Sequence, residues 1–527
     1  VQTVTVNLSE QLDSLSRTDQ RDKAQREIFE TYVLMLEDPV FKEEVRDFYK
    51  KELFNIEYTV QLKAEEYASK LRQSGNDYLA ERAQDITDIF GRVLDEMLDI
   101  HPFDINSVPD GSVILATSLS SSDTIVLSKR KIAGLALTEG GVSSHVVILA
   151  RNYGIPTVVG LEAITSKVRN GETVIIDGKA AELLVSPARN TIEEYKQKIR
   201  EEYLRKQSLK AFLKNPAVTK DGILFKLYAN IGTPEEAEMA LAEGADGIGL
   251  FRTEFLYMAQ SGASMNAAAR SFSEQTQFEA YKTVLQTMGD KPVTIRTLDA
   301  GGDKLINSVD IPVFDEKNPL MGLRAVRLCL ECPNVFKTQL RALYRASVYG
   351  NLKIMFPLIT SVEQVKQCLE IVTQVQTELS NEKIPFKKDT PVGIMVETAA
   401  AALISDCLVN VTDFFSLGTN DLTQMTYGFS RDDTAEIIRQ YVDKGILEAD
   451  PFKTLDQVGV GKLVETAVTL GKKVRPNIKL GICGEHGGDP KSIEFCNKVG
   501  LQYVSCSPYR VPVARLAAAQ AAIKQGK

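Results

Sequence analysis

Apolar side chains recur at helical spacing through the first hundred residues of the chain. The clearest apolar positions in this region are Ile28, Phe29, Tyr32, Val33, Met35, Leu36, Phe90, Val93, Leu94 and Met97. Spacings of three and four residues place such side chains on one face of a helix. Gly75-Asn76-Asp77 is typical of a turn between two helices. Residues 1–100 are therefore predicted to form an α-helical subdomain.

Short apolar runs separated by turn residues follow from residue 101. They lie at 113–115, 133–137 and 174–176, and this pattern is typical of short strands. We expect a small α/β domain over residues 101–187. The next segment, 188–221, begins with a charged, helical pattern, so it is predicted to be a helix that connects this domain to the rest of the chain.

From residue 222 the pattern changes to a strand followed by a helix, repeated to the end of the chain. The strand candidates are residues 224–229, 247–251, 293–297, 353–356, 392–396, 414–417, 480–483 and 503–506. Amphipathic helical patterns such as 233–243 and 361–379 lie between them. Eight strands in roughly 300 residues, each followed by a helix, is the pattern of a (β/α)8 TIM barrel. The predicted fold class is a multidomain α/β protein with a TIM barrel over residues 222–527.

The composition and charge of the chain favour some classes of protein and argue against others. The chain has 527 residues, of which 44% are apolar and 25% charged, as expected for several globular domains. It has no run of about 18 apolar residues and no secretory signal pattern, so we expect a cytoplasmic protein without membrane insertion. Its seven cysteines are expected to be reduced thiols. The net charge of −8 argues against sequence-independent nucleic-acid binding.

Charged side chains gather at the predicted carboxyl ends of the barrel strands, where TIM barrels carry out their chemistry. Glu397 and Asp421 offer the hard oxygen ligands that suit Mg²⁺. Arg252, Arg296 and Arg431 offer guanidinium groups that match phosphate and carboxylate oxygens. Further polar residues at these ends are Asn420 and Cys483. A network of structural ion pairs is the alternative for any single residue, but burying all of this charge without a ligand would be costly.

A glycine pair provides a second candidate contact for an anion. The loop Gly301-Gly302-Asp303-Lys304 could bring backbone N–H groups and the Lys304 ammonium near a phosphate. No GxxxxGK[ST] motif occurs in the chain, so we do not expect a P-loop to hold the phosphate donor.

His145 has the most informative surroundings of the three histidines, His101, His145 and His486. It stands in TEGGVSSHVVILAR, where a glycine turn leads into a helical pattern. At the first turn of a helix, unpaired N–H groups would face a phosphate on the imidazole ring, and Ser143 and Ser144 could cap the helix or donate hydroxyl groups. We interpret His145 as a candidate phosphohistidine, and a structural histidine at a helix start is the alternative.

Seven motifs together indicate a family. In chain order they are TEGGVSSHVVILAR, GIGLFRTEFLYM, IRTLDAGGDK, NPLMGLRAVRL, IMVET, SLGTNDLTQ and GICGEHGGDP. They resemble the motifs of Enzyme I of the bacterial phosphoenolpyruvate:sugar phosphotransferase system. The wider group that they resemble includes pyruvate phosphate dikinase and phosphoenolpyruvate synthase. The resemblance covers most of the chain.

The resemblance implies a role for each candidate residue. By this resemblance, Glu397 and Asp421 bind Mg²⁺. The residues implied to contact phosphoenolpyruvate or to assist at its site are Arg252, Arg296, Asn420, Arg431, Arg324 and Lys304. His145 would accept the phosphoryl group, and its small domain would swing between the barrel and the acceptor. Cys483 would protonate the enolpyruvate carbon to give pyruvate, although its position in the sequence alone favours a thiol packed in a strand.

The resemblance also indicates partners. The helical subdomain is similar to the one with which Enzyme I holds the carrier protein HPr, and Enzyme I forms a homodimer through its barrel. The segments TNDLTQMTYGFSRDD and GEHGGDP, however, are more similar to pyruvate phosphate dikinase. The favoured hypothesis is a phosphoenolpyruvate-protein phosphotransferase that uses HPr. The alternatives are a phosphotransferase with a different acceptor and a regulatory protein that binds phosphoenolpyruvate without turnover.

Overall fold

The computed structural model describes most of the chain and divides it into two compact units. The described residues are 4–5, 32–33, 35–37, 39–72, 86–87, 89–91, 93–98, 108–119, 130–138, 147, 150, 154–161, 164–210, 225–254, 256, 273–300, 316, 318, 321–431 and 433–524. One unit comprises Val1–Leu204 with Gly262–Ser264, and the other comprises Arg205–Ser261 with Met265–Lys527. The turn predicted at residues 75–77 and the candidates His145 and Lys304 lie outside the described residues.

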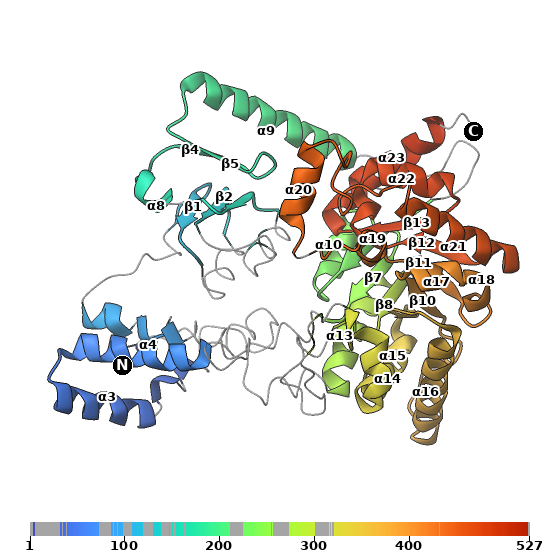
Figure 1. Ribbon diagram of the computed structural model, residues 1–527, viewed down its shortest axis with the longest axis horizontal. Coiled ribbons are helices and arrows are strands. Elements are labelled where there is room, and N and C mark those ends of the chain that lie inside the picture. The colour runs from blue at the N-terminus through green and yellow to red at the C-terminus, as the bar shows by residue number, and fades with distance from the viewer. Residues whose placement is uncertain are drawn as a thin grey trace. The chain divides into compact units, whose positions relative to one another are not determined.

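In the first part of the chain, the described residues lie mostly in helices, in agreement with the predicted helical pattern. Helices α3 (Pro39–Glu52) and α4 (Ile56–Arg72) pack against each other (Figure 1). Their shared core contains Phe41, whose ring stacks on Phe90 at a centroid distance of 4.1 Å. Asn55 marks the start of α4, because its Oδ1 accepts a hydrogen bond from the Tyr58 N–H at 3.0 Å; a capped helix start of this kind satisfies an otherwise unpaired donor.

The small α/β region contains the strands that the sequence predicts. Its strands are β1 (Val113–Ala116), β2 (Gly134–Leu137), β3 (Thr157–Val159), β4 (Val174–Asp177) and β5 (Glu182–Val185). The first three form a parallel sheet in the order β1-β2-β3, and the last two form an antiparallel pair. The short helix α8 (Ile164–Lys167) precedes β4, and the helix predicted after residue 188 is α9 (Arg189–Lys210).

Eight parallel strands close into a barrel in the second unit, which confirms the predicted TIM barrel. They are β6 (Lys226–Ile231), β7 (Ile248–Arg252), β8 (Pro292–Arg296), β9 (Asn351–Phe356), β10 (Val392–Val396), β11 (Phe414–Leu417), β12 (Lys479–Ile482) and β13 (Tyr503–Cys506). Each strand pairs with the next in chain order, and β13 pairs with β6 to close the ring. The carboxyl ends of all eight strands therefore meet at one mouth.

Helices surround these strands in Figure 1. The α-helices that the structure describes in this unit are α10 (Glu236–Ala242), α13 (Glu274–Met288), α14 (Ala325–Glu331), α15 (Pro333–Ala346), α16 (Val362–Asn381), α17 (Ala399–Leu403), α18 (Ser405–Leu408), α19 (Thr419–Tyr427), α20 (Ala435–Asp443), α21 (Val460–Val474), α22 (Pro490–Lys498) and α23 (Val511–Lys524). Short 3-10 helices are η4 (Ser347–Tyr349), η5 (Glu485–Gly488) and η6 (Pro508–Arg510). Among the described residues, no helix is both long and apolar enough to cross a bilayer.

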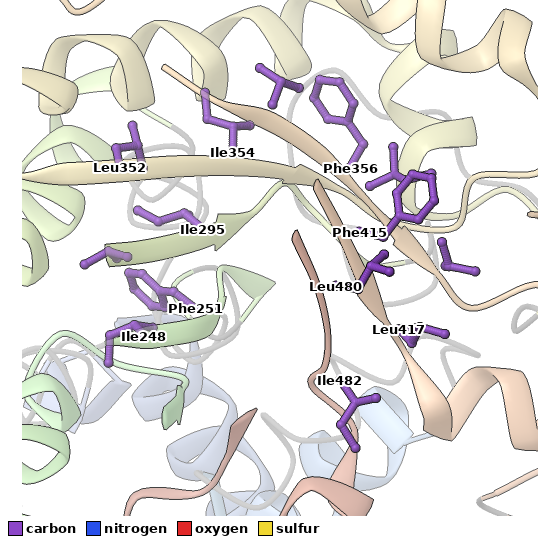
Figure 2. Close-up of a cluster of buried hydrophobic side chains, with 14 of the residues drawn as sticks. Ile248, Phe251, Ile295, Leu352, Ile354, Phe356, Phe415, Leu417, Leu480 and Ile482 are labelled. Carbon is purple, nitrogen blue, oxygen red and sulfur yellow. The ribbon is translucent and has the colours of Figure 1, made fainter. Parts of the chain in front are cut away.

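Successive side chains of each strand point alternately into the barrel and outward toward the helices. Residues such as Ile295, Phe415 and Ile482 belong to the large buried cluster between strands and helices (Figure 2). Because successive side chains of a strand point to opposite faces, the residues next to these point inward. A separate buried cluster fills the interior and consists of Leu250, Met355, Met395, Phe414 and Cys483. The polar residues at the carboxyl ends of the strands therefore lie next to this buried, mostly apolar cluster.

Candidate active site

Arg296, the last residue of β8, lies within a chain of buried charges. Its Nη1 is 2.7 Å from Asp299 Oδ2, and its Nη2 is 2.5 Å from Glu254 Oε1. Burial acts to lower the pKa of this guanidinium, but the carboxylates of Asp299, Glu254 and Glu397 raise it above its usual range. Arg296 therefore remains a fixed positive charge at the barrel mouth.

Asp299 extends this chain of charges to a second arginine. Its Oδ1 lies 2.6 Å from Arg324 Nη2, and Arg324 Nη1 lies 3.7 Å from Asp421 Oδ1. Arg324 immediately precedes α14 in an extended conformation, which lets its side chain reach residues that follow β8 and β11. Two arginines and the carboxylates between them thus connect the strand ends into one rigid group, as forked guanidinium pairs do.

Glu397 follows β10 and is buried, with 1% of its surface exposed. Its Oε1 accepts the Leu358 N–H at 2.6 Å, whereas its Oε2 has no hydrogen-bond partner among the described residues. Burial raises the pKa of Glu397 well above its usual range; the charges of Asp421 and Asp299 add to this effect, and Arg296 opposes it. A buried carboxylate oxygen without a partner is costly, so this site needs a cation or a proton.

Asp421 supplies the second carboxylate of this pair, from the first turn of α19. Burial raises its pKa, with a further contribution from Asp299, while Arg324, Arg296 and Arg431 act to lower it. A Cβ at Gly418 would lie 2.7 Å from Glu397 Oε2, so the glycine allows the loop after β11 to approach the carboxylate closely. After burial, the charge of Asp421 raises the pKa of Glu397, and the charge of Asp299 raises the pKa of both, which is typical of like charges at one site.

The pair fits a divalent cation that is completed by a ligand. Among the described residues, no group of three or more histidine, cysteine, aspartate or glutamate side chains is arranged to hold a metal. Mg²⁺ commonly takes one or two protein carboxylates and fills its other positions with water and substrate oxygens. A buried carboxylate with an unpartnered oxygen and a half-buried carboxylate beside it fit this requirement.

Two further arginines stand at the same mouth with exposed surface. Arg252, at the end of β7, has its Nη2 3.8 Å from Glu485 Oε1, and 28% of its side chain is exposed. Arg431 is exposed, and its charge acts on Asp421. Its backbone N–H donates to Gln424 Oε1 at 3.0 Å. Accessible guanidinium groups beside others that are already ion-paired with carboxylates suit the capture of an incoming anion.

Cys483 follows β12 at the base of the mouth and is 2% exposed. Its backbone oxygen accepts a hydrogen bond from Asn230 Nδ2 at 2.8 Å. Burial raises the pKa of the thiol to about 11, and the charge of Glu397 adds to this effect. The group therefore carries its proton at neutral pH and can act as an acid toward a ligand held above it.

We expect alkylation to distinguish this thiol from the exposed one. All seven cysteines are free, and Cys407 alone is exposed. Iodoacetamide reacts with thiolates, so at pH 8 it should label Cys407 while Cys483 stays unmodified, because burial blocks access and raises the pKa. Peptide mass spectrometry over a time course measures both sites in one sample. Equal rates at the two positions would contradict the buried, protonated state of Cys483.

The structure brings eight of the ten candidate residues to this mouth. They are Arg252, Arg296, Arg324, Glu397, Asn420, Asp421, Arg431 and Cys483. Sequence reasoning did not single out Glu254 or Asn230. Glu254 stands two residues after Arg252 in FRTEF, and Asn230 lies near the end of β6, so their positions at strand ends were the available signal.

Comparison with known protein families matches three regions of the chain. Residues 206–523 match the PEP-binding domain of the PEP-utilising enzymes, residues 108–181 match their mobile domain, and residues 2–82 match their N-terminal region. The first of these regions covers more than half of the chain.

Relatives that match most of the chain include three phosphoenolpyruvate-protein phosphotransferases. The chain is 38% identical over 501 residues to the phosphoenolpyruvate-protein phosphotransferase of Bacillus sp. (strain S). The matched region covers 94% of this chain and 82% of that protein. The values are the same for the protein of that name from Geobacillus stearothermophilus. For that of Bacillus subtilis (strain 168) the identity is 36% over 507 residues, covering 95% of this chain and 84% of the relative.

Proposed function

This chain belongs to the PEP-utilising enzyme family, among relatives that are phosphoenolpyruvate-protein phosphotransferases, and we propose that it moves the phosphoryl group of phosphoenolpyruvate first to His145 and then to the carrier protein HPr. The observation that carries the proposal is the unpartnered Oε2 of Glu397. Burial, and after it the charge of Asp421, raises the pKa of the Glu397 carboxyl group, which lies at a mouth lined with arginines.

Glu397 and Asp421 are the residues that would hold Mg²⁺ in this proposal. When bound, Mg²⁺ supplies positive charge that polarises the oxygens of the substrate. The pKa values of both carboxylates are raised, first by burial and then by neighbouring carboxylate charges, and this supports the assignment, because a bound divalent cation would compensate that negative charge. The Leu358 N–H would hold Glu397, and the ion pair with Arg324 would hold Asp421, when the substrate leaves.

The arginines have different roles in this proposal: some bind the substrate, and one stabilises the charge that develops during the reaction. Phosphoenolpyruvate carries a carboxylate and a phosphate, and each matches a guanidinium fork. Arg252 and Arg431 are accessible and can close on the ligand, whereas Arg296 is fixed and can stabilise the charge that develops on the departing oxygen. Asn420, Arg324 and Lys304 are assigned to the same site as supporting contacts.

The proposed reaction requires one nucleophile, His145, and one acid, Cys483. A nitrogen of neutral His145 attacks the phosphorus and forms the N–P bond, while the bond between phosphorus and the enol oxygen breaks and its electron pair leaves with enolpyruvate. Cys483 then gives its thiol proton to the terminal carbon of the enolate, which yields pyruvate, and the thiolate regains a proton from solvent. The mobile domain that carries His145 must approach the barrel for the first step and leave it for the second.

The helical region offers a surface suited to a protein acceptor. Leu53, Phe54 and Tyr58 expose apolar side chains at the start of α4, with Leu53 81% exposed. A pocket of about 410 Å³ beside them is lined by Tyr58, Gln61, Leu62, Glu65, Glu66 and Ser69. Apolar area flanked by carboxylates favours a partner with basic and apolar side chains, and we assign this surface to HPr. A cytoplasmic location and a homodimer through the barrel complete the proposal.

Label transfer to HPr tests this function. With radiolabelled phosphoenolpyruvate, Mg²⁺ and HPr, we expect label on HPr and one pyruvate released per phosphoryl group. Glu65→Lys, in the pocket, should slow transfer to HPr several-fold at low salt without changing self-phosphorylation, since steering depends on charge. Glu238→Lys, on an exposed position of α10, is the matched control. Label that remains on this chain with HPr present would rule out HPr as the acceptor.

A further inference from the structure

His486, three residues after Cys483, connects two loops of the barrel mouth. Its side chain is fully buried. Nδ1 lies 2.7 Å from Thr419 Oγ1, and Nε2 lies 2.9 Å from the Pro451 carbonyl oxygen. Because a carbonyl only accepts, Nε2 carries the proton, and Nδ1 accepts from the Thr419 hydroxyl. The ring is therefore a neutral imidazole with both nitrogens used, and burial, which lowers its pKa, is consistent with this state.

The loop that carries His486 is attached to its neighbours at two more points. The Glu485 N–H donates to Asn420 Oδ1 at 3.1 Å. The Cys483 carbonyl accepts from Asn230, whose own Oδ1 accepts from Ser505 Oγ at 2.5 Å. Side chains from β6 and from the start of α19 thus hold residues 483–486 from both sides.

The loop that carries His486 lies so close to the start of α19 that a side chain at Gly484 would not fit between them. A Cβ at Gly484 would collide with Thr419 Oγ1 and lie 3.2 Å from Asn420 Oδ1. Thr419 is the first residue of α19, and Asn420 and Asp421 follow it directly. The position of the Thr419 hydroxyl therefore fixes the start of the helix that bears the carboxylate.

We propose that His486 is a positioning residue: by holding the Thr419 hydroxyl and the Pro451 carbonyl, it fixes the Asp421 carboxylate relative to the Cys483 thiol. This inference rests on the proposed function, since it concerns the site at which a divalent cation and phosphoenolpyruvate would bind. His486 acts through Thr419 and is assigned no contact with substrate. Groups that orient metal ligands in this way commonly contribute about 10- to 100-fold to metal affinity or activity.

A matched set of threonine variants tests the inference. Thr419→Val removes the hydroxyl and keeps the shape, while Thr419→Ser keeps the hydroxyl. Thr412→Val is the control, because Thr412 is equally buried and its hydroxyl donates to the Leu408 carbonyl at 3.0 Å, before β11 rather than after it. Thermal midpoints are recorded for all three, and a general loss of stability should be similar for the two valine variants.

Binding of Mn²⁺, followed by electron paramagnetic resonance, is the readout that a merely structural role would not change. We expect Thr419→Val to weaken Mn²⁺ binding and to lower kcat for pyruvate release, each by about tenfold or more. Thr419→Ser should retain most of both, and Thr412→Val should match the wild type. His486→Gln, whose amide N–H can still reach Pro451, should weaken Mn²⁺ binding as Thr419→Val does, and it replaces that variant if the latter does not fold.

The outcomes separate this inference from the proposed function. Wild-type Mn²⁺ affinity in Thr419→Val, or in His486→Gln if it is used instead, would overturn the positioning role even if phosphoryl transfer is normal. A wild-type protein that binds Mn²⁺ but releases no pyruvate would overturn the proposed function, while the Mn²⁺ affinities of the variants would still decide whether His486 positions the carboxylate.

Discussion

Replacing His145 by alanine is expected to reduce the transfer of label from phosphoenolpyruvate to the protein by at least about 10⁴-fold, the scale seen when a nucleophile is removed. The substrate should still bind, because the groups assigned to hold it, Arg252, Arg296, Glu397 and Asp421, belong to the barrel unit. Rapid-quench measurement of protein-bound label gives the rate, and retention of Mn²⁺ and phosphoenolpyruvate binding shows that the site is intact.

His101→Ala is the matched control for this variant, since it makes the same change at another of the three histidines. It should keep the wild-type rate of labelling. Substantial label on the His145→Ala protein would mean that another side chain is the nucleophile.

Glu397→Gln is expected to lower Mg²⁺-dependent phosphoryl transfer by about a thousandfold. The change corresponds to the loss of about 4 kcal/mol of charge stabilisation, which is the scale of a metal ion's contribution to such a step. Glutamine keeps the shape of the side chain and an oxygen that can accept the Leu358 N–H, which now lies 2.6 Å from Oε1. The loss should therefore appear in metal binding rather than in folding.

We also predict the direction in which Glu397→Gln changes the thermal stability of the metal-free protein. The pKa of Glu397 is raised in the folded protein, so the metal-free wild type should lose stability as pH rises from about 4.3, the unfolded value, through the folded pKa. Glutamine has no such loss, so thermal unfolding at pH 8 in EDTA should give Glu397→Gln a midpoint at or above that of the wild type. Added Mg²⁺ should then raise the wild-type midpoint and leave the variant unchanged.

Glu363→Gln makes the same substitution at an exposed position of α16, where the carboxylate pairs with Lys366. It should retain wild-type activity and the wild-type response to Mg²⁺. A Glu397→Gln enzyme with activity within a few-fold of the wild type would remove this carboxylate from the proposed metal site.

The barrel was predictable because its signal is local and repeated. Each strand shows as a short apolar run, and eight such runs separated by helices leave few other folds. The predicted limits were less accurate where a strand begins with polar residues. The strand predicted at 353–356 is Asn351–Phe356, so it begins two residues earlier, at the polar residue Asn351.

The charge network of the site was not predictable in the same way. Arg296 and Asp421 were recognised as polar residues at strand ends and Arg324 through the family resemblance, but their pairing depends on the closure of the barrel. Arg324 and Asp421 are nearly one hundred positions apart in the sequence, yet their side chains lie 3.7 Å apart. The hydrogen bonds on which the role proposed for His486 rests were not predictable for the same reason, since both partners lie more than thirty residues earlier in the chain.

The most direct test of the account is to find where label from phosphoenolpyruvate resides on the wild-type protein. After a brief reaction without HPr and digestion at alkaline pH, the account predicts an acid-labile phosphate on the peptide that contains His145, formed with Mg²⁺ and absent with EDTA. Phosphate on any other residue, or labelling that proceeds equally well in EDTA, would contradict it.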